Sequence, residues 1–141
     1  YSEDFDPGTL TGTKGTLPVA EATDEFRQRL QDANGELTEF AYAGESYDAT
    51  ILAALAAVAA EDDTGAGIAS QMQAVSTEGT VCTSFAECVE LLEAGEDIDY
   101  DGVSGKIEFD GNGDPTSASI GIYEYGDDNT STPVDFIEGN V

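Results

Sequence analysis

The sequence contains no histidine, and only 4 of its 141 residues are lysine or arginine. Without an imidazole ring, the chain lacks the most common general base at neutral pH and an ordinary zinc site. Because 30 acidic side chains oppose the few basic ones, the formal net charge is −26. This charge repels nucleic-acid phosphates and anionic membranes, so we expect no nucleic-acid partner. It also attracts cations, and its simplest interpretation is a solvated, salt-tolerant surface.

Sequence motifs of common enzymes are missing as well. The chain has no G-x-S-x-G, no P-loop and no G-x-G-x-x-G run after a strand. Carboxylates are so abundant that no pair of them stands out as an acid–base couple. We therefore predict that the protein is not an enzyme.

No apolar run approaches the roughly 20 residues that are needed to cross a bilayer. The most apolar stretch is the alanine-rich segment 49–60, in which Thr50 is the only polar side chain. Ser46 is the predicted N-cap of this helix, and Asp48 falls in its predicted first turn. A helix that is apolar on every side must be surrounded, so the segment predicts a buried helix in a larger body. The length of 141 residues fits one domain.

Helical periodicity and alternation divide the rest of the chain into predicted helices and strands. Helices are expected over residues 20–33, 65–75 and 83–94, the last capped by Thr83 or Ser84 with Glu87. Strands are expected over 10–16 and 134–137, with a hairpin that pairs 106–110 and 119–125 through a Gly- and Asp-rich turn. The helix side chains expected to face the core are Phe26, Leu30, Ala33, Ile68, Met72, Val75, Phe85, Val89 and Leu92.

Two cysteines, Cys82 and Cys88, flank the start of the predicted helix 83–94 with the spacing C-x5-C. Two interpretations are open, namely free buried thiols, common in the cytosol, and a short-range disulfide, common outside the cell. Two thiols with no other soft ligand make a poor metal site. We favour the disulfide, which closes a loop of about 7 residues and stabilises the fold by about 2 kcal/mol in the chain-entropy description.

One stretch matches the spacing of an EF-hand calcium loop. Asp97, Asp99 and Asp101 alternate, Gly102 follows, and Glu108 comes after five further residues. Alternate carboxylates on a tight loop can surround a hard cation. However, Glu108 lies in an alternating strand pattern where an EF-hand begins its exiting helix. We therefore expect an acidic loop that enters the hairpin, without a cofactor, and keep calcium binding by these four carboxylates as the alternative.

Several motifs in a fixed order resemble a known family. They are Gly15-Thr16 with Pro18, a helix that carries Phe26, Glu45-Ser46-Tyr47-Asp48-Ala49 at the start of an apolar helix, the stretch 102–110, Gly113-Asp114-Pro115 and a strand with Ile122-Tyr123. This order resembles the C-terminal part of ABC-transporter solute-binding proteins of the branched-chain amino acid (Leu/Ile/Val-binding) type. The cysteine pair and the stretch 97–105 resemble actinobacterial members. The resemblance covers about Leu10 to Tyr125.

The resemblance implies an α/β fold that is part of a type 1 periplasmic-binding-protein fold. Residues 1–104 would form the end of the N-terminal lobe, and 105–141 would belong to the hinge and the second lobe. Family members close two lobes around a small solute, such as an amino acid, and deliver it to an ABC permease. The protein would then be extracytoplasmic, at the cell surface or in the periplasm, and lipid-anchored in its full-length form.

The same resemblance suggests ligand-binding residues. Tyr47 is the first candidate, because members often place an aromatic side chain near the cleft at the start of this helix, and Glu45 is a weaker one. The family's main groups for the carboxylate and amine of the ligand lie upstream and are missing here. The sequence is therefore expected to be a fragment, starting at Tyr1, that self-associates when isolated. The alternative function is an acidic calcium-binding surface or interaction module.

Overall fold

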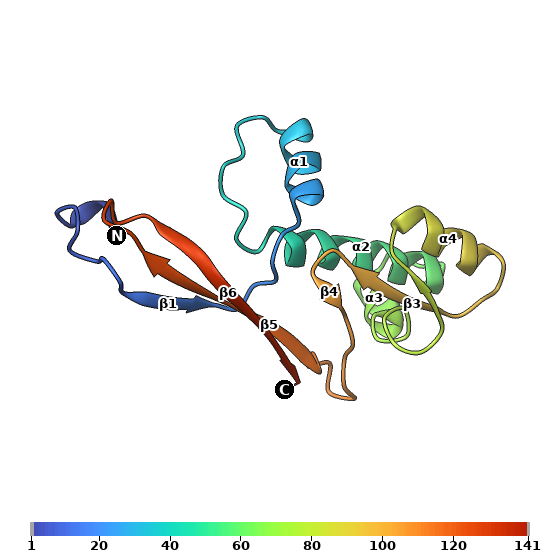
Figure 1. Ribbon diagram of the computed structural model, residues 1–141. Coiled ribbons are helices and arrows are strands. Elements are labelled where there is room, and N and C mark those ends of the chain that lie inside the picture. Colours follow the sequence, from blue (N-terminus) through green and yellow to red (C-terminus); the bar gives the residue numbers. More distant parts are fainter. Residues whose placement is uncertain (1, 141) are drawn as a thin grey trace.

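The computed structural model describes residues 2–140 and has a mixed α/β architecture, as predicted (Figure 1). The described elements, in chain order, are η1 (Ser2–Asp4), β1 (Lys14–Leu17), α1 (Asp24–Ala33), α2 (Ala43–Ala60), α3 (Gly65–Gln71), β2 (Thr80–Cys82), α4 (Phe85–Glu93), β3 (Ile98–Gly102), β4 (Gly105–Lys106), β5 (Ser117–Tyr125) and β6 (Ser131–Asn140). They form a helical body around α2 and a long β-ribbon that projects from one end of it.

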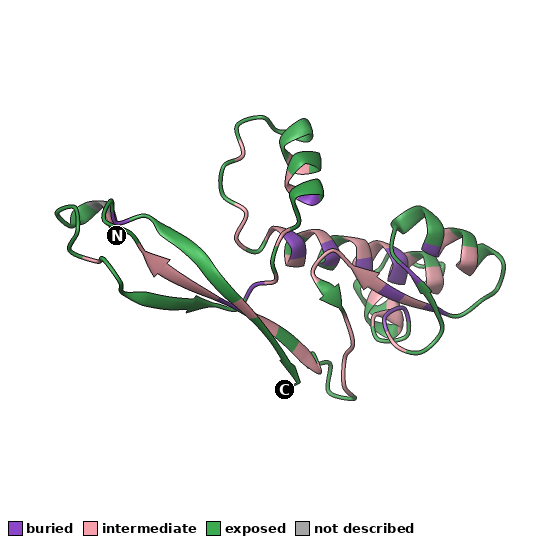
Figure 2. Ribbon diagram, in the orientation of Figure 1, coloured by how far each residue is buried: buried purple, intermediate pink, exposed green. Residues whose placement is uncertain are grey.

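The helical body contains most of the buried side chains (Figure 2). The buried cluster consists of Leu52, Leu55 and Ala56 from α2 together with Val75, Cys82, Cys88, Ile98 and Tyr100. The sequence predicted that α2 is enclosed on every side. This prediction is wrong in part, because Val58 remains 37% exposed. Among the described residues, no helix combines the length and the apolar character that crossing a membrane requires.

Helix α2 starts a turn earlier than its sequence predicts. Tyr42, in the left-handed region at φ 59°, precedes its first residue, and the N–H of Ser46 donates to the carbonyl oxygen of Tyr42 at 3.0 Å. Ser46 is therefore inside the helix, and its prediction as the N-cap is wrong. Asp48 lies in the second turn rather than the first, where its carboxylate finds donors outside the helix.

Three smaller elements lie close to their predicted ranges but are shorter. Helix α1 begins at Asp24 because the Thr23 hydroxyl caps it, accepting from the N–H of Phe26 at 3.2 Å. Helix α3 stops at Gln71, and strand β1 covers 14–17 instead of 10–16. Of the predicted core side chains in α1, Phe26 is buried, whereas Ala33 is exposed because the far end of the helix projects from the body.

Strands β2 and β3 are parallel and are joined through α4, which makes a β-α-β unit. Ile98 and Tyr100 alternate into the core from β3, each 0% exposed. The prediction of an acidic loop over this stretch is wrong. Residues 98–102 form a strand between β2 and β4, because the side chains of Ile98 and Tyr100 are buried in the core.

The N-terminus of α4 is capped as predicted, but the face of the helix that is buried differs from the predicted one. The Ser84 hydroxyl accepts from the N–H of Glu87, and the Glu87 carboxylate accepts from the N–H of Thr83 at 2.9 Å. Phe85, predicted to be buried, is 39% exposed, while Cys88 is 0% exposed. The helix presents Cys88 to the core because that residue forms the predicted disulfide with Cys82, with Cα atoms 5.4 Å apart.

The ribbon is an antiparallel sheet with the strand order β1-β5-β6. The predicted pairing of 106–110 with 119–125 is wrong, because β5 pairs instead with β6 through the short 126–130 loop. Segment 107–116 is left as a loop with one bridge, between Phe109 and Pro115. Since β1 pairs with β5, the ribbon combines strands from both sides of the predicted boundary after residue 104.

The N-terminal segment is fastened to the β5–β6 loop by Asn129. This side chain is 5% exposed. Its Nδ2 donates to the carbonyl oxygens of Phe5 and Asp6 at 3.1 and 2.9 Å, and its Oδ1 accepts from the N–H of Leu10 at 3.2 Å.

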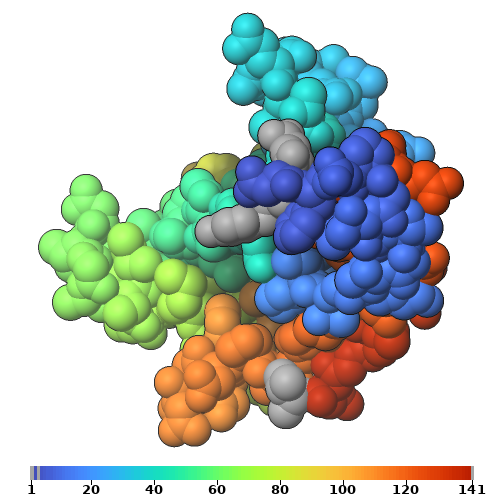
Figure 3. Space-filling model, turned by 90° about the vertical axis from the view of Figure 1, so that its left-hand side faces the viewer, coloured from blue at the N-terminus to red at the C-terminus, as the bar shows by residue number. Residues whose placement is uncertain are grey.

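Viewed from the ribbon end, α1, the α3 region and the 107–116 loop project in different directions (Figure 3).

The disulfide gives a direct stability prediction. Replacing both Cys82 and Cys88 by alanine should lower the free energy of unfolding by about 2 kcal/mol, because a short loop in the unfolded chain is no longer closed. Urea unfolding of the two proteins measures this difference. Alkylation of the unreduced, denatured protein should label no thiol, and two labelled cysteines would rule the disulfide out.

Candidate functional site

A cleft of about 320 Å³ opens between α2, the 104–109 segment and the ribbon. Most of its walls are apolar and include Leu52, Ile107 and Phe109. Two polar groups of α2, Glu45 and Asp48, reach the same cleft. A concave, mainly apolar site with a few convergent polar groups is the usual form of a small-molecule site.

The carboxylate of Asp48 holds the cleft wall together. Its Oδ1 accepts from the Tyr100 hydroxyl at 2.8 Å and from the N–H of Val103 at 3.1 Å. Its Oδ2 accepts from the N–H and the hydroxyl of Ser104 at 2.7 and 2.5 Å. Asp48 is only 1% exposed, and these four hydrogen bonds replace the water that burial removes. They fix the β3–β4 turn against α2.

The backbone around this carboxylate leaves no room for another side chain at Gly102. A Cβ atom at that position would overlap the Asp48 carboxylate. Gly44 at the start of α2 lies almost as close to the turn, since a Cβ there would come 3.4 Å from the Cβ of Ser104. Glycine is therefore required where the turn crosses the carboxylate.

The Tyr100 phenol stays uncharged in this arrangement. Burial, followed by the hydrogen bond to Asp48, raises its pKa above the usual range. Tyr100 thus acts as a neutral donor to the carboxylate. Because its side chain is also part of the core, it connects the cleft wall to the packing of the helical body.

Glu45, the weaker ligand-binding candidate, is among the residues that line the cleft, and its role there stays a prediction. Its Oε1 accepts from the N–H of Ala20 at 2.6 Å, which ties the segment before α1 to the first turn of α2. The side chain is half-buried and lines the cleft. Glu45 therefore brings a carboxylate into the cleft wall.

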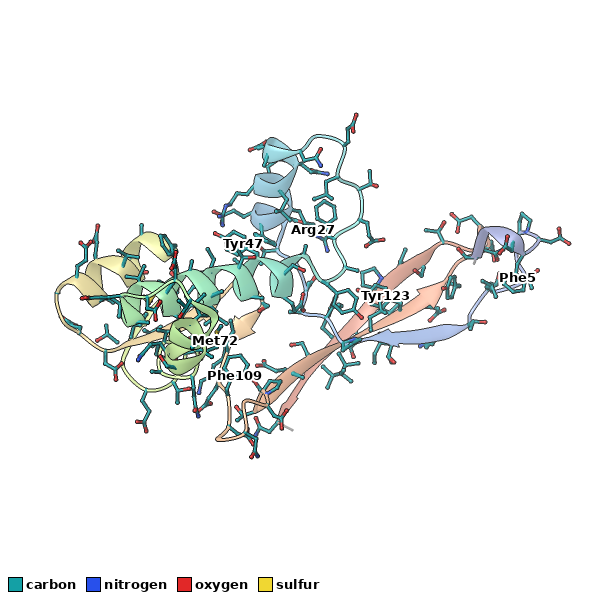
Figure 4. The ribbon with its side chains drawn as sticks, turned by 180° about the vertical axis from the view of Figure 1, so that it is seen from behind. Phe5, Arg27, Tyr47, Met72, Phe109 and Tyr123 are labelled. Carbon is teal, nitrogen blue, oxygen red and sulfur yellow. A yellow bond between two sulfur atoms is a disulfide. The ribbon has the colours of Figure 1, made fainter. Side chains whose placement is uncertain are left out.

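Tyr47, the first candidate, lies outside this cleft and packs against α1 (Figure 4). Its ring meets Phe26 edge-on with centroids 5.4 Å apart. Arg29 lies over the Tyr47 ring at 5.5 Å and donates to its hydroxyl at 3.2 Å. These contacts give Tyr47 a packing role, and ligand contact by Tyr47 stays a prediction.

The four carboxylates of the calcium motif are spread along a strand and a loop. Asp99 and Asp101 lie in β3, Asp97 precedes it, and Glu108 lies in the 107–116 loop, paired with Lys106 at 2.9 Å. The hydrogen bond to Lys106 lowers the pKa of Glu108, and burial, followed by the charge of Asp101, raises the pKa of Asp99. Within residues 2–140, no three of the carboxylates and thiols gather as a metal site. The expectation that no cofactor binds and its alternative, calcium binding by these four carboxylates, both stay untested.

Sequence reasoning missed the residues that build the cleft wall. It assigned Asp48 to the helix dipole, and the polar residues around Asp48, such as Glu45, Ser46 and Thr50, give no sign that this acid is buried. Buried acids need donors, and the Gly102–Ser104 turn supplies them from 55 and 56 residues away. Sequence spacing alone gives no indication of that contact.

The α/β architecture and the apolar cleft agree with a domain that binds small molecules. Residues 8–128 match the receptor family ligand binding region, so the chain belongs to this family. The family is one of receptors for small-molecule ligands and not of enzymes, and its type 1 periplasmic-binding-protein relationship agrees with the predicted partial fold. Comparison with curated proteins and with solved structures gave no match.

The hydrogen bonds of Asp48 generate a stability prediction. Asp48→Ala should lower the free energy of unfolding by about 3 kcal/mol or more, because buried donors of Tyr100, Val103 and Ser104 lose their acceptor. Urea unfolding measures the loss. Ser46→Ala, an exposed change on the same helix, is the matched control and should stay within about 0.5 kcal/mol of the parent protein. Equal stabilities of the two variants would contradict the assigned role.

Proposed function

We propose that the protein is the solute-binding component of an ABC importer for branched-chain amino acids or related small solutes. The family gives a small-molecule receptor, and the cleft beside α2 is the observation that supports this more specific role. Its apolar wall from Leu52, Ile107 and Phe109 suits a branched side chain. Glu45 suits the ammonium group of the same ligand.

The proposed location and partners follow from this role. An importer receptor works outside the cytoplasm, at the cell surface or in the periplasm, and a lipid anchor would keep the full-length protein near its permease. The buried disulfide between Cys82 and Cys88 supports an oxidising compartment. The solute, the permease and the anchor are parts of this proposal.

The ribbon supports the idea that further protein completes the site. Ile120, Val134 and Ile137 are 37–53% exposed on β5 and β6. Uncovered apolar side chains along a sheet favour association, at about 25 cal/mol for each Å² buried. The 141-residue chain alone is therefore proposed to self-associate, and light scattering would detect this.

Calorimetric titration with leucine, isoleucine and valine tests the function. The chain extended by its upstream residues should bind one of them in a saturable 1:1 manner, and the 141-residue chain should bind far more weakly. Glu45→Gln keeps the acceptor for the Ala20 N–H but removes the charge. It should weaken binding to the extended chain about tenfold or more.

The matched control is Glu36→Gln, which removes an exposed charge from the loop before α2 and should leave the affinity unchanged. An extended chain that binds none of the three amino acids would refute the proposed solute class. Tight binding by the 141-residue chain would instead show that the cleft is complete without upstream residues.

A further inference from the structure

The two arginines of this acidic chain are paired differently from its two lysines. Lys14 and Lys106 form ion pairs with Glu124 and Glu108 at 3.3 and 2.9 Å. Among the described side chains, no carboxylate lies within ion-pair distance of Arg27 or Arg29. Because the chain has 30 acidic residues, two arginines without a carboxylate partner are unexpected.

Both guanidinium groups lie over aromatic rings. The Cζ of Arg29 lies 5.8 and 5.5 Å from the ring centroids of Phe26 and Tyr47, and Arg29 also donates to the Tyr47 hydroxyl. The Cζ of Arg27 lies 5.8 Å from the ring centroid of Phe40. The Nε–H of Arg27, however, is buried and donates to no acceptor among the described residues. A buried donor without an acceptor is costly.

Arg27 lines a second pocket, of about 310 Å³, between α1, the 38–41 segment and the ribbon. Figure 4 shows Arg27 at the base of α1 and Tyr123 on the ribbon close to it. Tyr123 and Phe136 meet edge-on with ring centroids 6.3 Å apart, and Phe40 completes an aromatic wall. The pocket therefore combines one cation and an aromatic wall with other polar surface, and its volume lies at the small end of the usual range for ligands.

Among the described residues that line this pocket, Glu39 supplies the carboxylate, and one of its oxygens is engaged. Glu39 Oε1 accepts from the N–H groups of Phe40 and Ala41, each at 2.9 Å. These backbone bonds hold Glu39 in its own turn and away from ion-pair distance of Arg27. Burial, followed by the charge of Glu39, raises the pKa of Tyr123, so its phenol stays neutral. Arg27 is the cation of this pocket, and it has no ion-pair partner among the described residues.

We propose that this pocket binds a small organic monocarboxylate with an aromatic or branched apolar body. The ligand carboxylate accepts from Arg27, and its body packs against Phe40, Tyr123 and Phe136. A second negative charge on the ligand is disfavoured because the protein carries a net charge of −26. The site goes beyond the proposed function, since Glu45, Asp48 and Ser104 belong to the other cleft.

Titration of the ¹⁵N-labelled 141-residue chain with benzoate tests the proposal by NMR. High salt screens the overall negative charge and is the appropriate condition. Saturable shifts should appear at Phe40 and Tyr123. Benzamide, a neutral molecule of the same shape, should bind at least about tenfold more weakly, because a hydrogen bond to a charged group is lost. Equal affinities for benzoate and benzamide, or no saturable shifts, would overturn the proposal.

Two arginine variants locate the interaction. Arg27→Lys keeps the charge and the helix propensity but removes the planar guanidinium, whose paired N–H groups match a carboxylate, and it should weaken benzoate binding about tenfold or more. Arg29→Lys, two residues further on the same helix, should bind benzoate as the parent chain does. Retained binding in Arg27→Lys, or an equal loss in Arg29→Lys, would refute the assignment to Arg27. The amide spectra of both variants confirm that each is folded.

Discussion

The buried carboxylate of Asp48 is the interaction on which the rest of the structure depends. It joins the second turn of α2 to a turn more than 50 residues later through four hydrogen bonds. Without these donors, an ionised group that is 1% exposed would destabilise the core in which it lies. With them, the β3–β4 turn has a fixed position, and one wall of the cleft is set by α2. The wall of the cleft therefore depends on a single carboxylate that contacts the core through Tyr100.

The helical body and the ribbon differ in what they contain. The helical body contains the core and the disulfide, and the ribbon carries most of the exposed strand surface (Figure 2). The few cations are used locally, the lysines in surface ion pairs and the arginines against aromatic rings. Surface ion pairs of this kind add little stability. The arginines are therefore more informative about function than the lysines.

Local features were predictable from the sequence, and long-range partners were not. The α4 cap, the Cys82–Cys88 disulfide and the family all follow from residues that are close together or in a fixed order. The hairpin partner of β5 was predicted wrongly, because alternation shows that a strand exists but not which strand pairs with it. The strand at 98–102 was mistaken for a loop, because alternating aspartates concealed two buried side chains. The roles of Asp48 and Arg27 required the fold.

Amide hydrogen exchange at Val103 and Ser104 tests the central claim most directly. Both N–H groups belong to a tight turn, and turns generally exchange quickly unless a buried acceptor protects them. If both donate to Asp48, their exchange should be slowed to nearly the level of Leu55 in the core, because both need α2 to move away. Exchange within about tenfold of an unprotected peptide would show that the turn is free. Asp48 would then not be the anchor of the cleft.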